Sequence, residues 1–162
     1  MNNERTIATV VAGGKPAQRA VLSVDLVAAS YRSSGFPQEW THAMRQQEAR
    51  RYEMFLLLAA KHSGTRATPT REIDEFWHLH MLHPQAYYDD CMRIFGRIFD
   101  HDGGFGTAPG ELPVLKNAFQ KFAARWKKEY GQPYVECMPS DDAGATKCWH
   151  DCSNRCWHAC SN

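Results

Sequence analysis

Six side chains that can bind a metal lie in the last fifteen residues, in two copies of one short pattern. The copies read Cys148-Trp-His-Asp-Cys152 and Cys156-Trp-His-Ala-Cys160, so each offers two thiols and one imidazole within five residues. Thiolate and imidazole are ligands that Zn(II) and Cu(I) prefer, and two such units can close a four-coordinate site. The pattern therefore predicts a soft-metal site for Zn or Cu, made from Cys148, His150, Cys152, Cys156, His158 and Cys160.

The same segment also resembles the substrate of a modifying enzyme. Small peptide products made on the ribosome carry a leader that docks such enzymes, followed by a short core rich in Cys, Ser, Trp and Asn. In this alternative the chain is cut near Gly144-Ala145, and the modified residues are Cys148, Trp149, Cys152, Cys156, Trp157 and Cys160. The spacing of the cysteines permits a metal site without being diagnostic of one. A merely solvated tail is the third interpretation, although exposed Trp and free Cys favour aggregation and oxidation.

A second group of ligand-type side chains lies in the segment Glu72-Ile-Asp-Glu-Phe-Trp-His78-Leu-His80-Met-Leu-His83-Pro. On a helix, His80 shares a face with Ile73, Phe76 and Trp77, whereas Asp74 and His78 form an i, i+4 pair on the neighbouring face. We interpret His80 as a core histidine that is hydrogen-bonded to Asp89, Asp90 or a tyrosine hydroxyl.

The functional alternative for this helix is a metal site or a general base. Its candidate residues are Asp74, His78, His80, His83 and His101. A metal-dependent enzyme that uses His78, His80 and His83 is thus a third possible function. No Gly-x-Ser-x-Gly, Walker or His-Glu-x-x-His pattern is present, so we assign no catalytic residue and expect a non-enzymatic protein.

The histidine segment resembles the glycine-rich-domain-containing-protein-like family. The likeness is centred on Asp74, Trp77, His78, His80, Pro84, Tyr88 and Asp90, and it extends over about residues 20–130. The resemblance implies a helical domain and no particular activity. The chain lacks the long glycine-rich region from which the larger members are named.

Helical periodicity and stop signals predict the elements that position these residues. We expect helices over about 20–33, 37–62, 68–83, 85–100 and 111–130, with glycines at 103–106 ending the fourth. Inward faces are predicted for Met44, Tyr52, Phe55, Leu56 and Ala59, and for Tyr88, Cys91, Met92, Phe95, Ile98 and Phe99. The fold class is therefore all-α, a compact bundle of about five helices. The expected divisions are a flexible arm (1–19), the helical domain (20–138), a linker (139–147) and the tail (148–162).

Charge and hydropathy limit the partners. The formal net charge is +1 and the pI is about 7.7, so no global field attracts nucleic acid or an anionic membrane. No apolar run is long enough to span a bilayer, and no export signal is recognisable at the N-terminus. We therefore expect a cytoplasmic protein with reduced thiols. The expected partner is a protein or a modifying enzyme that docks on the helical domain.

Overall fold

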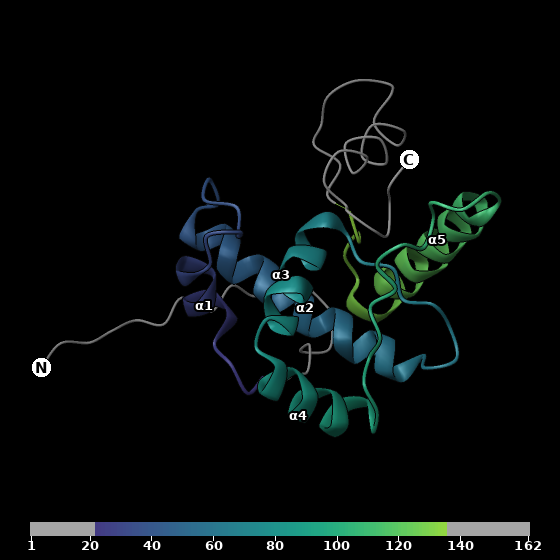
Figure 1. Cartoon of the computed structure of the whole chain (residues 1–162). Helices are drawn as coiled ribbons and strands as arrows, with labels where there is room; N and C mark the ends of the chain where they lie inside the picture. The colour runs from purple at the N-terminus through teal and green to yellow at the C-terminus, as the bar shows by residue number, and fades with distance from the viewer. Residues whose placement is uncertain (1–21, 136–162) are drawn as a thin grey trace, which may run out of the picture.

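A computed structural model describes residues 22–135 and contains five α-helices and no strand within that range. The helices are α1 (Leu26–Arg32), α2 (His42–Lys61), α3 (Arg71–Met81), α4 (Pro84–Phe95) and α5 (Glu111–Tyr130). In Figure 1, α2 runs through the centre of the molecule, α1, α3 and α4 gather around it, and α5 lies toward one end. The predicted all-α bundle is confirmed. The arm, the linker and the Cys-Trp-His tail lie outside the described residues.

The helices that begin and end with clear local signals match the prediction best. The Thr70 side chain accepts a hydrogen bond from the Ile73 amide and so caps α3. The helix α5 ends at Gly131, which adopts a left-handed conformation with φ of 70°. The helix α5 therefore has the predicted limits, and α3 begins three residues after and ends two residues before its predicted limits.

The first two helices begin later than predicted. Their N-caps are Asp25 and Thr41, whose side chains accept hydrogen bonds from Ala28 and Met44 amides, so Pro37 lies in the preceding loop instead of the first helical turn. The buried Arg45 fastens this loop. Its guanidinium donates to the carbonyl oxygens of Trp40 and Pro37 and to Ser30 Oγ, at 3.0, 2.8 and 2.9 Å.

The fourth helix ends earlier than predicted. Gly96, with φ of 69°, terminates α4, so the glycines at 103–106 do not. The buried face of α4 carries Tyr87, Asp90 and Cys91, whereas Tyr88 and Met92, predicted to face inward, are exposed. The inward assignment of Met44 on α2 is also wrong, since this side chain is exposed.

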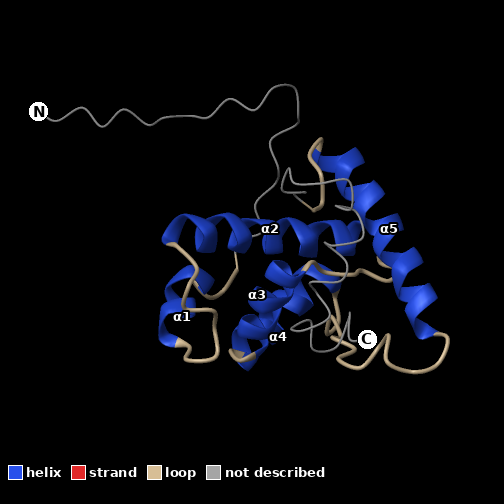
Figure 2. Cartoon of the chain, turned by 90° about the horizontal axis from the view of Figure 1, so that it is seen from above, coloured by secondary structure: helices blue, strands red, loops and turns tan. Residues whose placement is uncertain are grey.

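Aromatic side chains of α2, α3 and α5 pack against one another in the core. Phe55 of α2 packs against Trp77 of α3 and Phe122 of α5, with ring centroids 5.3 and 5.2 Å apart. Figure 2 shows α5 at a steep angle to α2, near its C-terminal end. The contact between these two helices is reinforced where the Tyr130 hydroxyl donates to the Met54 carbonyl oxygen at 2.8 Å.

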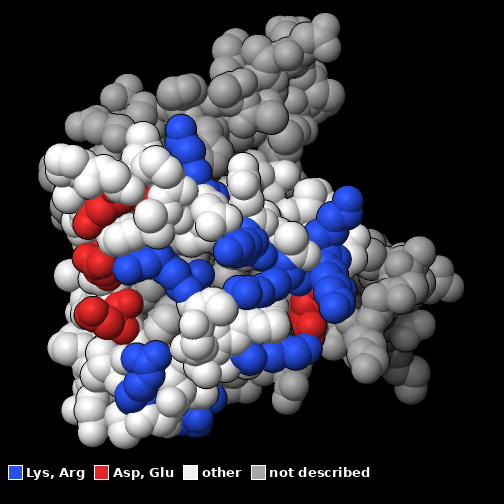
Figure 3. Space-filling model, turned by 90° about the vertical axis from the view of Figure 1, so that its right-hand side faces the viewer, with Lys and Arg blue, Asp and Glu red and all other residues white. Residues whose placement is uncertain are grey.

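The side of the molecule that carries α5 is rich in Lys and Arg, as Figure 3 shows. Lys116, Lys121, Lys127 and Lys128 are exposed on this helix. A near-zero net charge therefore coexists with a locally basic face. No helix within residues 22–135 combines the length and the hydropathy needed to cross a bilayer.

Candidate metal centre

Three ligand-type side chains converge beside α3. One ligand atom from each of Asp74, His78 and His101 lies within 4.8 Å of the other two. The Nε2 atom of His101 is 2.8 Å from Asp74 Oδ1, and His78 Nε2 is 3.7 Å from Asp74 Oδ2. The side chains of Asp74 and His101 are 5% and 7% exposed, whereas that of His78 is 35% exposed. The cluster is therefore enclosed on one side and open to solvent at His78.

Two of the three residues are positioned by the helix itself. Asp74 lies in the first turn of α3, where the helix dipole favours negative charge, and His78 follows one turn later on the same side. The i, i+4 spacing that the sequence suggested is thus present in the structure.

The third residue comes from the segment after α4. Phe99 stacks on Trp77 with ring centroids 4.7 Å apart and planes at 6°, and the Tyr87 hydroxyl donates to the Phe99 carbonyl oxygen. His101 follows two residues later and packs edge-on against Trp77 at 4.4 Å. These contacts hold the segment against α3, so His101 is placed by tertiary packing and not by helical spacing.

The cluster has the chemistry of a transition-metal site. Two imidazoles and one carboxylate are ligands that Zn(II) and similar divalent ions accept. A tetrahedral ion with bonds of about 2.0–2.1 Å separates its ligand atoms by roughly 3.4 Å. His101 Nε2 lies about half an ångström closer than this to Asp74 Oδ1, and His78 Nε2 approaches the other carboxylate oxygen, Oδ2. The side chains would therefore have to adjust to share one ion.

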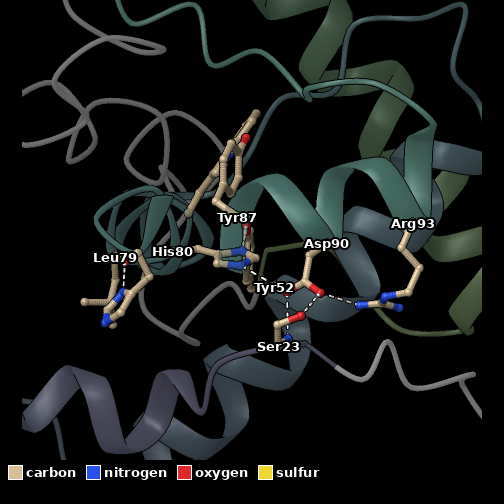
Figure 4. A network of polar contacts seen from close by, with 9 residues as sticks. Ser23, Tyr52, Leu79, His80, Tyr87, Asp90 and Arg93 are labelled. Carbon is tan, nitrogen blue, oxygen red and sulfur yellow. Dashed lines mark hydrogen bonds and ion pairs between the residues drawn. The ribbon is translucent and has the colours of Figure 1, made fainter. Parts of the chain in front are cut away.

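A second aspartate–histidine pair lies nearby and is closed. His80 is 1% exposed, with its Nδ1 3.0 Å from the Tyr52 hydroxyl and its Nε2 3.2 Å from Asp90 Oδ2 (Figure 4). Burial lowers the pKa of His80, although the charge of Asp90 opposes this effect. Burial also raises the pKa of Tyr52, which keeps its hydroxyl protonated. His80 therefore has the surroundings expected of a core histidine.

The carboxylate of Asp90 is saturated with donors. It accepts hydrogen bonds from the Ser23 amide and hydroxyl at 2.8 and 2.7 Å, and from Arg93 at 2.5 Å (Figure 4). Burial alone would raise the pKa of Asp90, but the hydrogen bonds from Ser23 and Arg93 and the proximity of His80 lower it overall. Asp90 therefore joins α4, α3 and the segment before α1. Ser23 lies 67 residues from Asp90 in the chain, so no local pattern indicated this contact.

The remaining candidates lie apart from the cluster. His83 Nδ1 is 2.9 Å from the Leu79 carbonyl oxygen, and Asp89 is exposed and accepts from Gln85. The structure thus brings together Asp74, His78 and His101, and separates them from His80 and His83. The predicted ligands and modification sites of the tail, from Cys148 to Cys160, lie outside the described residues.

Comparison with known proteins places this domain in a family. The model of the glycine-rich domain-containing protein-like family matches residues 8–90, which include Asp74 and His78 but not His101. Glycine-rich domain-containing proteins 1 and 2 of Arabidopsis thaliana are 31% and 30% identical over 121 and 123 residues, or 68% of this chain in each case. The matched part covers only 14% and 15% of those two proteins. No solved structure matches the chain. The family match and the two relatives show that this chain belongs to the glycine-rich domain-containing protein-like family.

Proposed function

We propose that the protein is a non-enzymatic binder of a divalent metal of the zinc class, and that its helical domain holds the ion with Asp74, His78 and His101. The observation that supports this proposal is the convergence of three ligand atoms from two separate segments within 4.8 Å. Most of the cluster is buried, which excludes competing water, while the exposed edge of His78 gives the ion a path to the site.

Zinc titration of a chain with an inactive tail tests this site. In this variant Cys148, Cys152, Cys156 and Cys160 become Ser, and His150 and His158 become Ala. We expect one zinc ion per chain, with affinity that falls as pH decreases because protons compete for the imidazoles. His78→Ala in this background should weaken binding by at least about tenfold, since even indirect support of a metal ligand is worth about 10–100-fold.

The matched control is His83→Ala, which removes an imidazole from the same region but not from the cluster. This substitution should leave zinc affinity within about twofold, because its ring is not among the converging ligands. Equal losses in the His78 and His83 variants, or no zinc binding by the tail-inactive chain, would refute the domain site.

The repeated tail supports a second proposal, that the chain also binds Zn or Cu(I) through its cysteines and histidines. The support is the duplicated pattern itself, with four thiols and two imidazoles in fifteen residues. This proposal includes a cytoplasmic location, because thiols stay reduced in the cytosol and remain available as metal ligands. In the rival proposal the tail is a peptide modified by an enzyme that docks on the helical domain.

The intact mass of the protein from its own host separates these two proposals for the tail. A full-length chain that loses the mass of an ion on denaturation supports metal binding. A chain cut near Gly144-Ala145, or one whose tail mass stays altered after denaturation, supports a modified peptide. An enzyme built on His78, His80 and His83 gains no support from the geometry, because these three rings do not converge.

A further inference from the structure

A cavity of about 140 Å³ lies next to the metal cluster but is separate from it. Its walls come from four parts of the fold: the loop at 65–69, Trp77 of α3, the segment at 99–105 and Leu115 of α5. His101 borders both the cavity and the cluster, whereas neither Asp74 nor His78 borders the cavity. The cavity is therefore a candidate binding site distinct from the proposed metal site.

The inner wall of the cavity is apolar and largely aromatic. Trp77 and Leu115 are 4% and 2% exposed, and the partly buried rings of Phe99 and Phe105 border the same space. Aromatic rings attract a further ring through edge-on or offset contacts, in addition to the effect of burying apolar area. An apolar cavity of about 150 Å³ is large enough to hold benzene. Size and lining therefore suit a ligand with one aromatic ring.

The outer rim of the cavity carries charged side chains that face solvent. Arg66 Nη1 is 3.3 Å from Asp102 Oδ2, and these side chains are 41% and 55% exposed. The Cζ atom of Arg66 lies 3.5 Å from the centroid of the Phe105 ring. Because the charges of the rim are solvated, an uncharged ligand can enter without leaving a buried charge unpaired. The rim therefore favours an uncharged molecule.

One polar group in the inner wall is unpaired. Thr68 is 3% exposed and borders the cavity, and its hydroxyl oxygen has no hydrogen-bond partner among the described residues. Thr65 also borders the cavity, but its hydroxyl donates to the His62 carbonyl oxygen and accepts from Arg125. A buried hydroxyl without a partner is unfavourable, and a hydroxyl on the ligand can supply the partner. We therefore expect the ligand to carry a hydroxyl group.

We propose that this cavity binds a small, uncharged phenol-type molecule, whose ring packs among Trp77, Phe99 and Phe105 and whose hydroxyl is hydrogen-bonded to Thr68. A phenol stays uncharged at neutral pH, since its pKa is about 10. The proposed binding goes beyond the metal function and does not depend on it, because neither Asp74 nor His78 borders the cavity.

Phenol, benzene and cyclohexanol are the probes, added to the full-length chain with a chelator so that no metal contributes. Phenol should cause saturable shifts of amide signals in NMR spectra, with a Kd on the order of 1 mM. Its ring protons should give NOEs to the methyl groups of Thr68 and Leu115. Benzene lacks the hydroxyl and cyclohexanol lacks the aromatic ring, so each should bind about three- to tenfold more weakly.

Thr68→Val isolates the contribution of the hydroxyl. A methyl group of similar size replaces it, so phenol affinity should fall about three- to tenfold while benzene affinity should not fall. The matched control Thr65→Val should leave phenol affinity within about twofold, because the Thr65 hydroxyl is already hydrogen-bonded. Circular dichroism verifies that both variants fold. If Thr68→Val does not, Phe105→Ala at a partly exposed position should weaken phenol and benzene binding alike.

Four outcomes overturn the inference. Phenol shifts that do not saturate by about 10 mM mean that the cavity does not bind this class of molecule. Equal phenol affinity in Thr68→Val and Thr65→Val excludes the hydroxyl contact, and equal affinity for phenol and cyclohexanol excludes recognition of the ring. NOEs to the exposed side chains of Tyr88 and Met92, in place of Thr68 and Leu115, mean non-specific association with the surface. None of these results depends on the zinc titration, so the two proposals fail separately.

Discussion

Two aspartate–histidine groups in this domain, His80 with Asp90 and Asp74 with His78 and His101, differ in how deeply they are buried. Asp90 and His80 are each 1% exposed and lie 3.2 Å apart, Ser23 and Arg93 donate hydrogen bonds to Asp90, and Tyr52 is hydrogen-bonded to His80 Nδ1. The group around Asp74 has two histidines, one of them 35% exposed. The same two residue types, Asp and His, are therefore fully buried in one group and partly exposed in the other. The closed group joins three segments of the fold, whereas the open group is the one for which we propose metal binding.

The largest expected difference between the groups is in stability. Asp90→Ala should lower the free energy of unfolding by about 3–5 kcal/mol, because it leaves buried polar partners uncompensated. Urea denaturation measures this change, with Asp90→Asn as a milder variant if the first does not fold. The control Asp89→Ala removes an exposed carboxylate and should stay within about 0.5 kcal/mol. A decrease of less than about 1 kcal/mol in the unfolding free energy of Asp90→Ala would mean that the buried group does not stabilise the helix packing.

Zinc should act on the open group alone. At a free concentration of 100 times Kd, zinc should raise the free energy of unfolding of the tail-inactive chain by about 2.7 kcal/mol. The same zinc concentration should stabilise His78→Ala by at most about 1.4 kcal/mol, because the variant binds zinc at least about tenfold more weakly. Its stability without metal should be nearly that of the parent, because the side chain is partly exposed. Zinc-dependent stabilisation of this variant that equals that of the parent would place the ion elsewhere.

A smaller effect tests the partners of the closed group. Ser23→Ala removes the hydroxyl that donates to Asp90 but leaves the backbone donor, so we expect a loss of about 1.5 kcal/mol in unfolding free energy. The matched control is Ser34→Ala, at an exposed position in the loop after α1. Equal stability of the two variants in urea would mean that Ser23 does not support Asp90.

The smallest expected effect is a change in slope with pH. Burial lowers the pKa of His80, so below the unfolded value of about 6.5 the unfolded chain takes up a proton that the native chain does not. Stability should therefore decrease as pH falls from about 6.5 toward the lowered native pKa. His80→Gln should flatten the dependence in this window, whereas His62→Gln should not. Below about 3.8 the lowered pKa of Asp90 adds a further loss of stability.

The sequence predicted features that depend on contacts between neighbouring residues better than features that depend on contacts between distant residues. Thr70 and Gly131 set the ends of α3 and α5 by contacts within a few residues, and the predicted limits of both helices lie within three residues of the observed ones. The inward face of α4 was correct at Cys91 but wrong at Tyr88 and Met92, because the buried positions beside Cys91 belong to Tyr87 and to a charged residue, Asp90. A hydrophobic pattern cannot reveal a charged residue that is buried by its partners.

The candidate site was only partly predictable for the same reason. Spacing on one helix paired Asp74 with His78, but it could not choose among His80, His83 and His101 as a third member. His101 is 27 residues from Asp74 and reaches it only because the segment after α4 stacks on Trp77. Contacts of that range depend on tertiary packing, which periodicity does not encode.

Arg45 stabilises the connection between α1 and α2 by hydrogen bonds to both sides of it. Its guanidinium binds two carbonyl oxygens of the 33–41 loop and Ser30 of α1, and none of these contacts involves His80 or Asp90, whose lowered pKa values make stability depend on pH. Mild acid should therefore open the molecule unevenly. Amide hydrogen exchange should speed up first around the contact of α4 with α3, while amides near Arg45 stay protected until the whole domain unfolds.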